Sequence, residues 1–136
     1  MKFEELKYYI PSLDDIRIGY ECEVYEQSTD KLIPQREWYK AVISWGQITR
    51  KTIAITNCKR LIKENHLRTQ FLTKEQIEAE GWKGEKPGIF NKGENLLMWW
   101  DWLNRIEIDT GGCENGYGGE CRCINDFRLI CKLLKI

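Results

Sequence analysis

The sequence predicts an α+β fold, in which short helices cover a mostly antiparallel sheet. Residues 16–24 and 38–45 alternate apolar and polar side chains, as strands with one buried face do. Residues 73–82 and the apolar spacing that starts at Phe127 are instead typical of helices. We therefore expect one sheet of about five to seven strands with two or three short helices, the C-terminal one packed on the sheet. A chain of 136 residues predicts a single domain over 1–136.

The helix over 73–82 has both of its ends marked in the sequence. Thr73 and Gln76 are spaced as a capping box, in which each side chain accepts a hydrogen bond from the other residue's backbone N–H. Leu72 and Ile77 are placed to form a hydrophobic staple across that cap. Gly81 supplies a left-handed residue at the end, which lets Trp82 fold back toward Ile77.

The remaining elements follow from shorter patterns. An amphipathic turn or helix is expected over 3–9, a helix over 58–64 capped by Asn57, and a C-terminal helix capped by Asn125. Tight turns are expected at 91–93 and 101–104. Further strands are predicted over 52–56, 89–90, 95–100, 105–109 and 120–123. The strand over 95–100 is apolar on both faces, which predicts a central or well-covered position.

Three segments carry a resemblance to a group of proteins. Residues 72–82 (LTKEQIEAEGW), 18–23 (IGYECE) and 124–128 (INDFR) resemble segments of short uncharacterised proteins of gut anaerobic bacteria and their phages, in the same order along the chain. The resemblance implies a bacterial or phage accessory gene product. It implies no catalytic residue, ligand or cofactor.

Charge is balanced overall but unevenly distributed. The 21 basic and 21 acidic residues cancel, yet residues 31–74 hold ten basic and two acidic side chains. This segment either marks an anionic partner or is neutralised by acidic residues elsewhere on the surface. The N-terminus lacks the apolar run of a signal peptide, and no segment has the about twenty apolar residues of a membrane span. We expect a cytoplasmic protein, no membrane partner, and thiols for all six cysteines.

Aromatic residues supply the leading functional hypothesis. Trp99, Trp100 and Trp102 cluster at the end of a predicted strand and its turn. Because neighbouring strand residues face opposite ways, at least one of Trp99 and Trp100 is poorly covered, and tryptophans beside turns often anchor interfaces. The sequence thus favours a non-enzymatic binding module that contacts a protein partner or a second copy of itself.

The basic segment supplies the alternative, which is a module that binds a nucleotide or nucleic acid, for example a phage counter-defence protein that captures a host signal. Phosphate binding needs clustered cations, and aromatic rings beside them would stack on bases. The cations are Arg50, Lys51, Lys59, Arg60, Lys63 and Arg68, and the aromatic residues near them are Trp38, Tyr39 and Trp45.

Other constellations point to structure rather than chemistry. Cys113, Cys121, Cys123 and Cys131 lack the pairwise spacing of a zinc site, so we expect core thiols and no metal. His66 has no nucleophile signature with Cys58, and Glu21 with Glu23 is an ordinary pair on a strand face. The glycine-rich segment 111–119 precedes no phosphate-binding helix. We therefore predict no cofactor and no catalytic residue.

Overall fold

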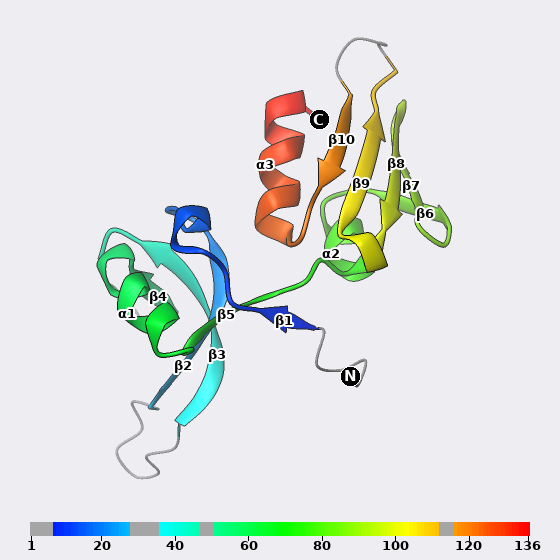
Figure 1. Cartoon of the computed structure of the whole chain (residues 1–136). Helices are drawn as coiled ribbons and strands as arrows, with labels where there is room; N and C mark the ends of the chain where they lie inside the picture. Colours follow the sequence, from blue (N-terminus) through cyan, green and yellow to red (C-terminus); the bar gives the residue numbers. More distant parts are fainter. Residues whose placement is uncertain (1–6, 28–35, 47–50, 112–115) are drawn as a thin grey trace. The chain divides into compact units, whose positions relative to one another are not determined.

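The computed structural model describes residues 7–27, 36–46, 51–111 and 116–136, shown in colour in Figure 1. The chain divides into two compact units, Met1–Phe71 and Leu72–Ile136. Each unit contains one five-stranded sheet, and no described strand belongs to both sheets. The two units are therefore described separately.

The sheet of the first unit has the strand order β1-β5-β2-β3-β4. Its strands are β1 (Tyr8–Tyr9), β2 (Glu21–Gln27), β3 (Arg36–Ser44), β4 (Thr52–Ala54) and β5 (Leu67–Gln70). All neighbours pair antiparallel except β3 and β4, which are parallel. The long β2–β3 pair, with Glu21 opposite Val42 and Gln27 opposite Arg36, is the centre of this sheet.

A single helix, α1 (Cys58–Lys63), covers one face of the first sheet (Figure 1). It buries Cys58 and Leu61 against strand residues that alternate along the sheet, so that one side of each strand is dry. The strand members of this core are Cys22, Val24, Ala41, Ile43, Ile53 and Leu67. Two short 3₁₀ segments complete the unit, η2 (Leu13–Asp15) and η3 (Ile55–Asn57).

The sheet of the second unit is antiparallel throughout, in the order β10-β9-β8-β7-β6. Its strands are β6 (Lys83–Lys86), β7 (Ile89–Lys92), β8 (Asn95–Trp100), β9 (Arg105–Asp109) and β10 (Tyr117–Glu120). Strands that follow one another in sequence are neighbours in space, so the sheet is a meander. The β8–β9 turn contains η4 (Asp101–Leu103) and ends at Asn104, whose φ of 50° is left-handed.

Two helices lie against this sheet, α2 (Lys74–Ala79) and α3 (Ile124–Leu134). The longer, α3, runs beside β10 and β9 (Figure 1) and buries Ile124, Phe127 and Ile130. The shorter, α2, contributes Ile77 to the same cluster. The strand residues of this core are Phe90, Leu97, Ile106 and Ile108, all from one face of the sheet. No buried residue belongs to both this cluster and the core of the first unit.

The second unit starts with the capped helix that the sequence predicts over 73–82, and this segment is called the corner. Gln76 N donates to Thr73 Oγ1 over 3.2 Å, and Thr73 N donates to Gln76 Oε1 over 3.0 Å, which confirms the capping box. Gly81 has a φ of +95°, a conformation that favours glycine, and Trp82 is buried with Leu72 and Ile77. Leu72 N also donates to Arg122 O over 2.8 Å, which ties this corner to the residues just before α3.

The α+β class is confirmed, as is the packing of the C-terminal helix on a sheet. The difference lies in the number of sheets, because the ten strands form two sheets rather than one. The first predicted strand is also shorter than its alternating pattern. Gly19, at φ +89°, makes a turn after Ile18, so that β2 begins at Glu21. One domain over 1–136 stays a prediction.

Four differences correct the sequence reading. Residues 83–86, where no strand is predicted, form edge strand β6, and the last strand is Tyr117–Glu120 rather than 120–123. Helix α3 begins after Cys123, so Asn125 lies inside its first turn and is not the cap. Of the helix expected over 3–9, residues 1–6 lie outside the described residues, and Tyr8–Tyr9 pairs with β5 as a strand.

We expect Thr73→Ala to lower the free energy of unfolding by about 1 kcal/mol, because it leaves the N–H of Gln76 without its side-chain acceptor. Urea unfolding followed by circular dichroism measures the change. Thr73→Ser keeps the hydroxyl and is the matched control, which should stay within about 0.5 kcal/mol of the parent chain. Equal losses for the two variants would show that the cap hydrogen bond does not stabilise the corner.

Candidate functional site

The face of the second sheet that points away from α2 and α3 carries an apolar stripe along β8. Leu97 is in the core, so its neighbours Leu96, Met98 and Trp100 point to the other side. Ile89 of β7 lies directly opposite Met98 and extends the stripe sideways. We call Ile89, Leu96, Met98 and Trp100 the β8 stripe. Leu96 is 37% exposed and the other three are half-buried.

The two adjacent tryptophans of β8 divide between these faces. Trp99 packs against the core, with its ring centroid 6.3 Å from that of Phe90. Trp100 faces outward with the β8 stripe, opposite Arg105. The prediction that the pair faces opposite ways is confirmed, and it is Trp100 that belongs to the uncovered side. Trp99 is half-buried and packs against the core, on the face opposite to Trp100.

Beyond β8 the chain exposes further apolar area. Trp102 is 75% exposed and Leu103 is 51% exposed in η4. The segment is fixed locally, since Trp102 N donates to Asp101 Oδ1 over 2.8 Å and Asn104 N to Asp101 O over 3.2 Å. Two large side chains held on a short, hydrogen-bonded turn are typical of interface anchors.

Charged side chains of β9 border the β8 stripe. Arg105, Glu107 and Asp109 lie opposite Trp100, Met98 and Leu96 in that order. Arg105 Nη2 is 3.2 Å from Glu107 Oε1, and both side chains are largely exposed. The strand therefore places a cation at one end of the stripe and a carboxylate at the other.

The first unit has an uncovered sheet face of a different kind. Arg68 of β5 alternates with the buried Leu67 and Thr69, so it lies on the side away from α1. Its guanidinium carbon is 3.7 Å from the ring centroid of Tyr8 and 4.0 Å from that of Trp38. Both its Nε and Nη2 donate to Glu23 Oε1, over 2.9 and 2.7 Å. Four strand residues thus form one compact aromatic and ionic cluster.

The structure disperses the predicted basic site. Lys59, Arg60 and Lys63 are exposed on α1, which covers the opposite face from Arg68, and Arg60 pairs with Glu64 over 3.2 Å. Lys51 is exposed just before β4, and Arg50 lies outside the described residues. Of the predicted aromatic residues, Tyr39 packs against the core, and Trp45 is 81% exposed just after the end of β3. Arg68 and Trp38 do come together.

Sequence reasoning missed Tyr8, Glu23 as a partner of Arg68, and the aliphatic part of the β8 stripe. Tyr8 and Arg68 are sixty residues apart in the chain, and only the strand register brings them together. The β8 stripe did leave a signal, because Leu96, Met98 and Trp100 alternate in the sequence. That alternation was hidden by apolar residues at the intervening positions.

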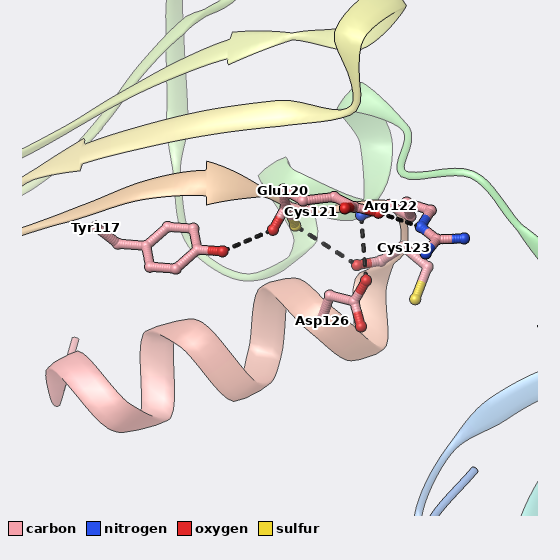
Figure 2. Close-up of polar contacts among 6 residues, drawn as sticks. All are labelled: Tyr117, Glu120, Cys121, Arg122, Cys123 and Asp126. Carbon is pink, nitrogen blue, oxygen red and sulfur yellow. Dashed lines mark hydrogen bonds and ion pairs between the residues drawn. The ribbon is translucent and has the colours of Figure 1, made fainter. Parts of the chain in front are cut away.

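Two cysteines of the second unit, Cys121 and Cys123, lie at the junction between β10 and α3 (Figure 2). Cys121 Sγ donates to Cys123 O over 3.8 Å, and the two sulfurs point in different directions. The junction is held by Arg122 N, which donates to Asp126 Oδ2 over 3.1 Å, and by a contact between the Arg122 guanidinium and Glu120. Cys131 is half-buried on α3, and Cys113 lies outside the described residues.

Burial makes Cys22, Cys58, Cys121 and Cys131 poor nucleophiles. It raises the pKa of Cys22 from an ordinary 9.0 to about 12, with smaller contributions from Cys58, Glu23 and Glu21. It raises the pKa of Cys131 to about 11, and it raises the pKa of Cys58 and, by a larger amount, that of Cys121. Since the thiolate is the reactive form, these side chains act as small apolar residues of the two cores.

The other candidate constellations do not assemble. Cys58 is buried and donates to Ala54 O, whereas His66 lies against the ring of Tyr25, with its Nδ1 3.2 Å from Glu64 Oε2. Glu23 is paired with Arg68 rather than with Glu21 in a carboxylate dyad. In the described part of the chain, no group of three or more His, Cys, Asp or Glu residues is arranged to hold a metal ion.

The chain matches no protein-family model, no curated protein and no solved structure. None of the helices in the described ranges has the length and apolar character needed to cross a membrane.

We predict that the folded chain reacts slowly with iodoacetamide at pH 8. Three pKa units make the thiolate of Cys22 about a thousandfold scarcer than that of an ordinary thiol, and its reaction rate should rise about tenfold per pH unit up to about pH 12. Mass spectrometry of alkylated peptides measures the rate at each residue. Cys113→Ser is the background, because Cys113 lies outside the described residues. Reaction of Cys22 or Cys121 at the rate of a free thiol would contradict their burial.

Proposed function

We propose that the protein is a non-enzymatic binding module whose second unit associates with a second copy of the chain through the β8 stripe. The observation that carries the proposal is a strand with apolar side chains on both faces, of which the helices cover only one. Trp102 and Leu103 continue the apolar surface at the end of that strand. Burying apolar surface of this kind against a partner removes it from water, which makes the free energy of association more favourable.

Charge favours a second copy as the occupant. Sheets that pack face to face keep their strands roughly aligned. A two-fold axis across the strands would reverse one copy, so that Arg105 of each β9 lies over Asp109 of the other. The β8 stripes would then cover each other, and the formal net charge of zero gives little repulsion between copies. The surface is thus complementary to itself at its two ends, whereas Glu107 in the middle, which pairs with Arg105 of its own chain, would lie near Glu107 of the second copy.

The wider biological setting stays a prediction. A bacterial or phage accessory role is implied only by the resemblance of three segments, and a different protein partner is the other occupant that the surface would accept. The nucleotide alternative loses its basic segment, since α1 carries Lys59 and Lys63 away from Arg68. What supports that alternative is the Arg68 cluster, which is a separate site on the first unit.

Sedimentation equilibrium over a concentration series from about 1 to 200 μM should show a dimer whose dissociation constant lies in that range, as expected for an interface of modest size. Leu96→Lys and Trp102→Ala should each weaken it by about tenfold or more, because each removes apolar contact from the proposed interface. Trp45→Ala removes an equally exposed tryptophan from the first unit and is the matched control.

The two-fold arrangement has its own test in a charge exchange. Arg105→Glu alone and Asp109→Lys alone should weaken the dimer, whereas the double variant should recover it, since the cation and carboxylate are merely exchanged. A chain that stays monomeric throughout the series would contradict self-association. A dimer that depends on Trp45 and not on Leu96 or Trp102 would contradict the location of the interface.

A further inference from the structure

The guanidinium of Arg68 is held in one position before any ligand arrives. Tyr8 comes from β1 on one side of β5 and Trp38 from β3 on the other, and their ring centroids lie 3.7 and 4.0 Å from the guanidinium carbon. Glu23 fixes its rotation by accepting from both Nε and Nη2. An arginine in this state has already lost the side-chain freedom that binding would otherwise cost.

One edge of this guanidinium remains available. A guanidinium has five N–H groups in a planar fork, and Glu23 takes the edge formed by Nε and Nη2. Within the described part of the chain, no protein group accepts from Nη1 or from the second N–H of Nη2. The Arg68 side chain is 26% exposed, so water or a ligand reaches it. The free edge is a donor pair that matches two oxygens of an oxyanion.

The surroundings add a second cation and more rings. Lys40 lies directly opposite Glu23 on β3 and is exposed on the same face. The ring of Tyr25 is 5.3 Å from that of Trp38, and His66 lies 5.6 Å beyond Tyr25. Trp38, Tyr25 and His66 therefore form a row of rings on one side of Arg68, and Tyr8 lies on the other. Such rows offer planar bases a surface on which to stack.

We propose that the Arg68 cluster binds the phosphate of a nucleotide, with the free edge of the guanidinium donating to two phosphate oxygens and the base lying on the neighbouring rings. The same chemistry is presented by a free nucleoside monophosphate and by single-stranded nucleic acid. This site lies on the first unit and uses none of the residues of the β8 stripe, so it is independent of the proposed self-association.

Glu23 limits the affinity of the site for phosphate, so the proposal predicts that removing its charge makes phosphate bind more tightly. Its carboxylate accepts from the same guanidinium, and its side chain is only 15% exposed, so it repels an incoming phosphate at close range. Replacing Glu23 by Gln keeps an oxygen acceptor for Arg68 and removes the negative charge. If the Glu23–Arg68 pair served only to stabilise the fold, Glu23→Gln would lower the free energy of unfolding and would not increase the affinity for any phosphate ligand.

Isothermal titration of the full chain tests the proposal with two kinds of probe. One is the four 5′-nucleoside monophosphates, with adenosine as the matched ligand without phosphate, and the other is a twelve-residue oligothymidylate. Arg68→Lys keeps the charge but loses the fork, and it should weaken binding by about tenfold to a hundredfold. Lys63→Ala removes a cation from α1, on the other face, and should change affinity by less than about twofold.

Each outcome decides the matter. If the monophosphates bind and Arg68→Lys weakens that binding, the ligand is a free nucleotide. If the oligothymidylate alone behaves in this way, the ligand is single-stranded nucleic acid. Tighter binding by Glu23→Gln supports the site even if Arg68→Lys fails to fold, and unchanged or weaker binding by folded Glu23→Gln overturns it. The proposal is also overturned if neither probe binds at about 1 mM. Equal affinity for adenosine and for adenosine 5′-monophosphate would also overturn the proposal. So would a loss of affinity in Lys63→Ala as large as that in Arg68→Lys.

Discussion

The organisation of the chain depends on burial at one face of each sheet. In the first unit α1 closes a core on one side of the strands, and in the second unit α2 and α3 do the same. The two cores share no residue. One helix of six residues covers a face of the first sheet, and two helices of six and eleven residues cover a face of the second, so that the other face of each sheet meets water or a partner.

The two uncovered faces differ in chemistry. The β8 stripe is aliphatic and aromatic, and its charges lie along one neighbouring strand. The face of the first sheet instead fixes a cation among rings and pairs it with a half-buried carboxylate. Removing apolar surface from water favours association with another apolar surface, whereas an ordered guanidinium favours a ligand that accepts hydrogen bonds. The same plan of folding thus gives one surface suited to another protein chain and one suited to an oxyanion.

Local features were predictable from the sequence, and features set by strand register were not. The capping box at Thr73, the turn at 101–104 and the opposite facing of Trp99 and Trp100 follow from neighbours in the chain. The partners of Arg68 come from β1, β2 and β3, so their meeting depends on pairing over long distances. The division into two sheets was also hidden, since alternation shows that a strand has a dry face but not which core that face joins.

Isolation of the fragment Leu72–Ile136 tests most directly whether each sheet closes its own core. Its amide resonances should be dispersed and should overlay those of the same residues in the full chain, because every member of the second core lies within the fragment. Cooperative urea unfolding of the fragment is the companion result. A fragment with the narrow amide dispersion of an unfolded chain would contradict the account, since the second core would then depend on residues before Leu72.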